Sequence, residues 1–259
     1  RFMGESTQPG GALAVFRHMQ QFTPNVKLVG LSGTEAWADK ELRGALPEHS
    51  DLVVRSDAIT TIIKQRFVEP EASGKELSKL FSVNYIDGDP TPKAVTAEVA
   101  KKIRAHIDSA DLVLAMDFGH GVFEDEIRDM VQEHSAFLAL NCQTNSNNHG
   151  YNVIDRRFQR ADSFSLDQAE IHLAAGKRHI DYEQELRRLT QKLSAQYAWL
   201  TRGSITTLGL RGDEPICHCP PFERIVVDSV GAGDAFCALA SLAAAAGLPL
   251  PLATFMGQL

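Results

Sequence analysis

Along most of the chain, short apolar runs of strand length alternate with amphipathic segments that have the period of a helix. Thr91-Pro92 is typical of a helix start, with an N-cap residue followed by proline at the first helical position. The apolar positions behind it recur every fourth residue and predict one buried stripe: Val95, Val99, Ile103 and Ile107. A further helix, predicted from about residue 181 to 196, carries three leucines on one face: Leu186, Leu189 and Leu193.

The apolar runs between the helices predict a parallel sheet. They span residues 112–116, 137–140 and 198–200, and they stop at Asp117, Asn141 and Thr201. Continuously apolar strands that alternate with helices are typical of an α/β sheet covered on both faces. Ligands bind at the carboxyl ends of such strands, so we expect these three polar residues along one rim.

Between about residues 51 and 87 the strands follow one another without helices. The segments are 52–54, 61–68 and 79–86. Lys64 and Arg66 share one face of their strand at period two, as Phe81, Val83 and Tyr85 do on theirs. The pattern predicts a small antiparallel sheet that protrudes from the main domain as a lid.

Composition narrows the classes of partner. The 259 residues are 44% hydrophobic, which is enough for a large core, and the net charge of −7 argues against nucleic-acid or anionic-membrane partners. The longest apolar stretch, 235–251, is short for a membrane span and predicts a buried helix. Four cysteines and the lack of an apolar run at residue 1 fit a cytoplasmic enzyme.

Cys217-His218-Cys219 could suggest a metal pair. Zinc sites normally have two to four residues between paired cysteines and need a second pair, whereas Cys217 and Cys219 have one residue between them. This segment is therefore interpreted as a strand or loop.

The segment Gly231-Ala232-Gly233-Asp234 precedes an apolar helix. Helix starts expose backbone N–H groups, and glycines let an anion approach them, so the segment suits a phosphoryl group in transfer. Asp234 can accept a proton from an attacking hydroxyl. A dinucleotide fingerprint would need glycine where Phe236 stands, and the chain has no Gly-Lys-Ser/Thr tripeptide of a Walker A loop. The alternative is a glycine-rich turn in which Asp234 only caps the helix.

Residues 228–236, Asp-Ser-Val-Gly-Ala-Gly-Asp-Ala-Phe, resemble the D-T-x-G-A-G-D-x-F signature of PfkB (ribokinase-like) carbohydrate kinases, with Ser229 in place of Thr. Gly10-Gly11 resembles the family's N-terminal glycine pair. Segments 64–68 and 117–121 resemble the heptose-phosphate kinase branch, and residues 141–152 resemble kinase domains of bifunctional sugar kinase/nucleotidyltransferases. The resemblance implies one ribokinase-like domain over residues 1–259, incomplete at both ends, with a parallel sheet between helices and a β lid.

The resemblance also implies roles in phosphoryl transfer. Asp234 would be the general base, and the N–H groups of the preceding residues would form the anion hole: Gly231, Ala232 and Gly233. Asp228 would lie near a monovalent cation such as K⁺. Asp167 and Glu170 stand where the family has N-x-x-E, the motif that organises Mg²⁺; the alternative is an ordinary acidic helix start.

The remaining implied roles concern ATP and the acceptor. Thr201 and Gly203 would meet the nucleotide phosphates, and Gly10 and Gly11 would allow close approach of the sugar. Lys64 and Arg66 would contact a sugar phosphate from the lid, unless they only guard an exposed edge. Asp117 would accept a hydrogen bond from a sugar hydroxyl.

Two departures leave the acceptor open. Ala14 stands where the family has a sugar-binding Asn, and Asn141-Cys142-Gln143 replaces the D-P-K segment of heptose kinases. The predicted function is ATP-dependent phosphorylation of a sugar or sugar phosphate, heptose-phosphate-like. The alternatives are a nucleoside or vitamin-type kinase of the same fold and a non-catalytic sugar sensor. A homodimer through the lid is expected by analogy.

Overall fold

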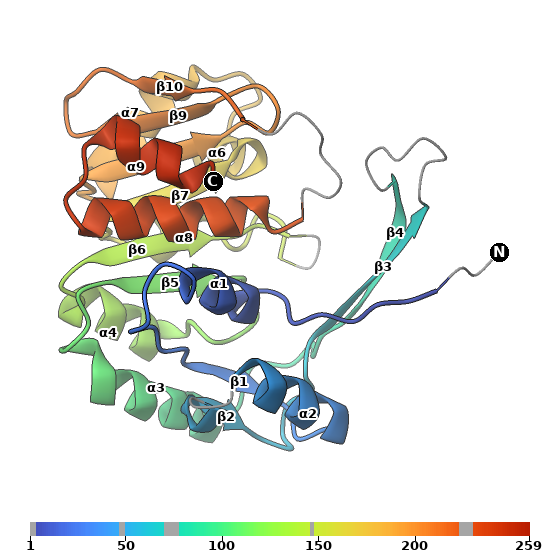
Figure 1. Cartoon of the computed structure of the whole chain (residues 1–259). Coiled ribbons are helices and arrows are strands. Elements are labelled where there is room, and N and C mark those ends of the chain that lie inside the picture. Colours follow the sequence, from blue (N-terminus) through green and yellow to red (C-terminus); the bar gives the residue numbers. More distant parts are fainter. Residues whose placement is uncertain (1–3, 47–49, 70–77, 146–147, 223–229) are drawn as a thin grey trace.

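The computed structural model describes residues 4–46, 50–69, 78–145, 148–222 and 230–259 (Figure 1). Its main sheet has the strand order β10-β9-β8-β7-β6-β5. The strands are β5 (Val113–Asp117), β6 (Leu138–Cys142), β7 (Ser163–Asp167), β8 (Tyr197–Thr201), β9 (Thr207–Arg211) and β10 (Cys217–Cys219). β5 to β8 are parallel, which confirms the predicted sheet, whereas β9 and β10 add an antiparallel edge that was not predicted.

Helices cover both faces of this sheet (Figure 1). They are α1 (Ala12–Met19), α3 (Lys93–Ile107), α4 (Asp125–His134), α5 (Ile154–Arg157), α6 (Gln168–Ala175), α7 (Tyr182–Lys192), α8 (Ala232–Ala245) and α9 (Leu250–Gly257). Side chains of β8 alternate between two cores. Tyr197 and Trp199 pack against α8 and α9, whereas Ala198 and Leu200 join the larger core on the opposite face. No helix in the described ranges is both long and apolar enough to span a bilayer.

The local rules for helix ends explain where prediction and structure differ. α3 begins one residue later than expected, with Pro92 rather than Thr91 as N-cap. α7 begins as predicted, because the Asp181 carboxylate accepts hydrogen bonds from two backbone N–H groups of its first turn. The prediction of a single helix over 235–251 is wrong. Gly247 adopts a left-handed φ of 77°, and α9 starts after Pro249, so the stretch forms two helices.

A second, smaller sheet lies apart from the first. It pairs β1 (Gly30–Ser32) with β2 (Val53–Arg55) in parallel, and α2 (Ala36–Ala45) connects them; the 3₁₀ turn Ser50–Leu52 precedes β2. The segment 52–54 was predicted among the lid strands. Its pairing with β1 places it in the body instead.

The lid is the antiparallel pair β3 (Ile63–Glu69) and β4 (Ser78–Tyr85), which projects from the body (Figure 1). Cross-strand partners share a face, so Lys64 and Arg66 lie with Asn84 and Ser82. The opposite face, called the apolar lid face below, carries apolar side chains: Ile63, Phe67, Phe81, Val83 and Tyr85. Phe67 and Phe81 stack across the strands with their ring centroids 4.3 Å apart.

Candidate active site

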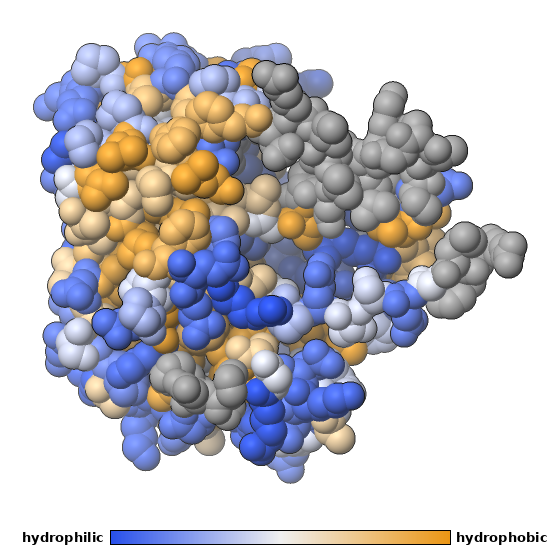
Figure 2. All heavy atoms as spheres, viewed as in Figure 1, coloured by the Kyte–Doolittle hydropathy of each residue, from blue (hydrophilic) through white to orange (hydrophobic). Residues whose placement is uncertain are grey.

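An open cleft of about 2940 Å³ runs between the lid and the body. The first turn of α8, the start of α1 and the carboxyl ends of the central strands line it, and the lid forms its far wall. The hollow is visible between the body and the lid in Figure 2. Two of the three predicted rim residues, Asn141 and Thr201, therefore open into one cavity.

Asp234 enters this cleft from the first turn of α8. Gly231 caps the helix in the left-handed region, with φ 85°, a conformation that favours glycine. The first helical hydrogen bond runs from the Ala235 N–H to the Gly231 carbonyl, so the N–H groups before Ala235 are not used within the helix. A Cβ placed on Gly231 or Gly233 would meet no atom of the described residues within 4 Å. Among these residues the turn thus offers donors beside open space, which is what the predicted anion hole requires.

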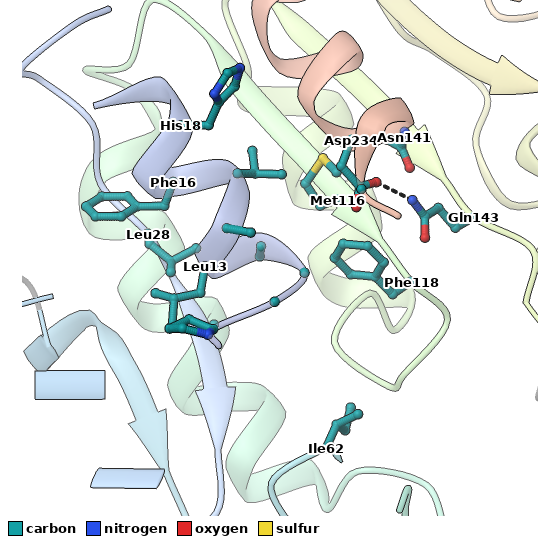
Figure 3. A pocket seen from close by; sticks show the side chains of 18 of the residues that line it. Leu13, Phe16, His18, Leu28, Ile62, Met116, Phe118, Asn141, Gln143 and Asp234 are labelled. Atoms are coloured by element: carbon teal, nitrogen blue, oxygen red, sulfur yellow. Dashed lines mark hydrogen bonds between the residues drawn. The ribbon is translucent and has the colours of Figure 1, made fainter. Parts of the chain in front are cut away.

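The environment of Asp234 suits a proton acceptor. Burial raises the pKa of the Asp234 carboxyl to about 6, while the hydrogen bond from Gln143 and the charge of Lys64 oppose the shift. The Gln143 side-chain amide donates to Asp234 Oδ1, as Figure 3 shows. A base whose pKa lies just below neutral pH is ionised at pH 7 and still takes up a proton readily.

The lid brings cations to the same cleft. Lys64 and Arg66 both line it, and Lys64 is half-buried. Burial and the charge of Arg66 lower the pKa of Lys64, whereas Asp234 raises it. His120 lies nearby, and burial together with the Lys64 charge lowers the pKa of His120 to about 4, so its ring is neutral at pH 7. His120 Nε2 is buried without a hydrogen-bond partner among the described residues.

Gly10 and Gly11, predicted to allow close approach of the sugar, lie where α1 begins and line the cleft. Gly11 caps α1 with φ 55° and sits beside the Phe118 ring, 3.5 Å from where its Cβ would be. Because the two glycines carry no side chains, the cleft stays open next to the Phe118 ring, which is labelled in Figure 3.

The structure does not bring Asp117 to the cleft. Its side chain is 2% exposed, and its carboxylate accepts hydrogen bonds from Arg157 Nε at 3.1 Å and from the Gly119 N–H at 2.9 Å. Gly119 has φ 69° and lies against Asn148, so no side chain fits there. Phe118 and His120 of this half-buried turn line the cleft, but the ion pair with Arg157 holds Asp117 away from it, so the structure does not support the predicted contact of Asp117 with a sugar hydroxyl.

Asp167 and Glu170 form a capping box at the start of α6. Asp167 Oδ1 accepts from the Glu170 N–H, and Glu170 accepts from the N–H groups of Asp167 and Thr144, so the capping alternative describes their contacts. Both residues also line the cleft. Burial, followed by the charge of Asp167, raises the pKa of Glu170 to about 8.

The carboxylate oxygens of Asp167 and Glu170 are of the kind that binds Mg²⁺. Mg²⁺ prefers oxygen ligands and usually retains several waters rather than entering an all-protein cage. Within the described ranges no three His, Cys, Asp or Glu side chains gather to hold a metal by themselves. Asp167 and Glu170 therefore suit a Mg²⁺ that is held largely through water and phosphate.

Of the two residues predicted to meet the nucleotide phosphates, one lines the cleft. Thr201 ends β8 beside Asp167, its register partner on β7, and lines the cleft. Gly203, with φ 54°, lies in the turn between β8 and β9 and is not among the cleft residues. Asp228, predicted near a monovalent cation, lies outside the described residues.

Sequence reasoning did not single out two cleft residues for their roles here. Gln143 follows β6 and contacts Asp234, and His120 lies in the turn after β5. Both stand just past a strand end, which is the signal that placed Asn141 on the rim. Asn141 itself lines the cleft, and its side-chain oxygen is buried without a partner among the described residues.

The fold is similar to that of solved kinase structures. Phosphofructokinase-2 from Escherichia coli, in complex with substrates and products, matches 100% of this chain with a TM-score of 0.77 at 12% identity, and 82% of that chain is covered. Ribokinase from Thermotoga maritima matches 95% of this chain and 76% of its own with a TM-score of 0.65 at 16% identity. The fold is that of the ribokinase-like kinases, as predicted.

Sequence comparison agrees with the fold. Residues 138–259, a little under half of the chain, match the model of the pfkB family carbohydrate kinases, in line with the predicted resemblance. The bifunctional protein HldE of Paramagnetospirillum magneticum is 23% identical over 261 residues, and that of Proteus mirabilis is 25% identical over 260. The matches include 98% and 97% of this chain but 51% of each relative, so the chain spans about half the length of these relatives.

Proposed function

We propose that the chain phosphorylates a hydroxyl of a sugar or sugar phosphate with ATP, using Asp234 as the general base. The observation that carries the proposal is a single juxtaposition. A half-buried carboxylate in the first turn of α8 shares one cleft with the lid cations Lys64 and Arg66. A base, an anion-binding turn and a site for a second anion are the parts that phosphoryl transfer to a phosphorylated acceptor requires.

In the proposed reaction Asp234 takes the proton of the acceptor hydroxyl. The hydroxyl oxygen forms a bond to the γ-phosphorus, the bond from that phosphorus to the bridging oxygen breaks, and ADP leaves with the electron pair. The N–H groups of Ala232 and Gly233 would stabilise the charge on the transferred group, because they are oriented before the reaction begins. Mg²⁺, organised by Asp167 and Glu170, would neutralise phosphate charge when bound.

The direct test is a screen for ADP release with sugars, sugar phosphates, nucleosides and vitamin-type alcohols as acceptors. We expect turnover with a phosphorylated sugar, heptose phosphates included. Turnover only with a nucleoside or vitamin would support the second kinase hypothesis. Sugar binding without ADP release across the panel would support a sensor and contradict the proposal.

Removing both lid cations should weaken binding of a phosphorylated acceptor. For Lys64→Ala with Arg66→Ala we expect KM for the acceptor to rise about 10- to 100-fold, because hydrogen bonds to charged groups contribute about 1.5–3 kcal/mol. KM for ATP should stay unchanged. Kinetics are measured at pH 8, above the pKa of Asp234 near 6, so that Asp234 stays ionised.

Lys79→Ala is the matched control for the lid cations. Lys79 is an exposed lid lysine that does not line the cleft, and its removal changes the net charge in the same direction. An equal loss in this variant would mean that the lid acts through its total charge and not through acceptor contacts.

The apolar lid face supports a second proposal, a homodimer in which two such faces pack together. Four of its residues also line the cleft: Ile63, Phe67, Phe81 and Tyr85. Its five apolar side chains are exposed, and Phe81 is 54% exposed. Apolar side chains gathered on one exposed face mark an interaction surface, and the ribokinase-like fold gives a second copy as the expected partner.

Phe81→Asp should convert the dimer to a monomer, because it places a charge within the apolar contact. Light scattering after size-exclusion chromatography measures the mass. Tyr151→Asp is the control, since Tyr151 is an exposed aromatic residue away from the lid and the change should leave the dimer intact. A wild-type protein that is monomeric at tens of micromolar would contradict the proposal.

A further inference from the structure

The side chain of Gln143 contacts Asp234 across the cleft although the two residues lie 91 positions apart in sequence. Gln143 follows the carboxyl end of β6, whereas Asp234 belongs to α8 (Figure 3). Its amide nitrogen donates to Asp234 Oδ1. An amide that donates to one carboxylate oxygen fixes the rotation of the carboxylate and leaves its second oxygen free to face an acceptor.

The backbone of Gln143 is itself held in place. Its N–H donates to the Asp117 carbonyl at 2.8 Å, and its carbonyl accepts from the side-chain amides of Asn152 at 3.0 Å and Asn148 at 3.3 Å. Asn152 also donates to the Asp117 carbonyl at 3.1 Å. The buried Asp117–Arg157 ion pair anchors this turn. A side chain that starts from so constrained a backbone can hold its partner in one geometry.

We propose that Gln143 is a positioning residue that holds the Asp234 carboxylate in place and stabilises its ionised form. The inference rests on the proposed role of Asp234 as the base. The sequence marks Gln143 only as the residue that replaces the lysine of the D-P-K segment, and the contact with Asp234 gives it a separate role. A neutral donor at this position would orient the base without adding a second fixed cation beside Lys64.

Other groups around Asp234 also affect its charge and must be separated from Gln143. Lys64 on β3 favours the ionised form, and burial disfavours it. Among the described residues, the charge of Asp234 acts on Glu170 of α6 and Cys237 of α8, and further titratable groups line the same cleft: His18, Arg66, His120 and Asp167. A substitution at Gln143 leaves all of these in place, so a change at Asp234 can be attributed to the lost donor.

The test measures the titration of Asp234 directly, by NMR of protein labelled with carbon-13 at the aspartate carboxyls. The signal that Asp234→Asn removes assigns the residue. In the wild type it should titrate near the pKa of about 6. Gln143→Met keeps the chain length and removes the donor, and its Asp234 should titrate about one pH unit higher, as expected for loss of a hydrogen bond to a charge.

Gln143→Lys supplies the conservative rescue, because it restores a donor and adds a positive charge. Asp234 should then titrate below its wild-type value. The acid limb of kcat/KM should move in the same direction as the NMR titration in both variants. Gln191→Met, an exposed Gln on α7, is the matched control and should shift neither. Folding of each variant is checked by its thermal midpoint.

An unchanged Asp234 titration in a folded Gln143→Met protein would overturn the proposal, as would a uniform loss of kcat/KM at all pH values with an unmoved acid limb. The NMR readout does not depend on turnover. If the titrations shift as expected while the wild type phosphorylates no acceptor, the contact stands and the proposed kinase function fails. If turnover is found without the shift, the function stands and Gln143 has only a packing role.

Discussion

Asp234→Asn should lower kcat about 10²- to 10⁴-fold, the contribution typical of a positioned general base. The amide cannot accept the hydroxyl proton, but it keeps the size of the side chain and leaves the first turn of α8 intact. ADP release is measured with the acceptor found by the screen, and ATP binding is followed separately by calorimetry. ATP affinity should change little, because the backbone N–H groups of the turn remain.

Asp167→Asn is the matched control for that experiment. It is the same chemical change at another cleft carboxylate, in the capping box of α6, and it restores the Asn of the N-x-x-E pattern. We expect it to retain most of the activity. An Asp234→Asn protein that turned over as fast as this control would show that Asp234 only caps its helix.

Trp199→Ala should lower the free energy of unfolding by about 3–5 kcal/mol, the range for removing a fully buried aromatic side chain. Trp199 is 0% exposed in the centre of β8 and packs against Tyr197 and Phe236. Its indole N–H donates to Thr254 Oγ1 at 3.0 Å, so the variant also leaves a buried hydroxyl without this donor. Urea unfolding followed by circular dichroism measures the loss.

The other tryptophan of the chain, Trp37 on α2, serves as the control because it is 43% exposed. Trp37→Ala should cost less than about 1 kcal/mol. Similar losses in the two variants would contradict the packing of α8 and α9 on β8.

Hydrophobic patterning predicted the elements that follow simple periodicity. The strands at 113–117, 138–142 and 197–201 and the helix that begins after Asp181 appear within a few residues of their expected bounds. Patterning failed where pairing is decided at long range. The segment 52–54 resembles any short apolar strand, and only its partner β1 assigns it to the body. The short β9 and β10 end an otherwise parallel sheet, which periodicity cannot reveal.

The candidate site divides in the same way. Motif reasoning identified Asp234, the glycine turn and the lid cations, because local sequence determines helix starts and strand faces. It could not reveal that Arg157, 40 residues away, donates a hydrogen bond to the Asp117 carboxylate. It also could not see that Gln143 reaches Asp234. Such contacts depend on how the strand ends meet in space, and a single sequence carries no direct signal of that.

The separation of the lid from the main sheet has a consequence for how this protein can acquire new acceptors. β3 and β4 pair with each other and with no other strand in the described part of the chain, while the proposed base and its supporting turn belong to the body. Apart from Lys64, whose charge acts on Asp234, mutations in the hairpin therefore leave the main core and the Gln143 contact of Asp234 in place. Under the proposed function, acceptor preference can evolve in the hairpin while the residues proposed for phosphoryl transfer stay constant, so a library over residues 63–69 and 79–85 with Lys64 kept is the natural starting point for changing it.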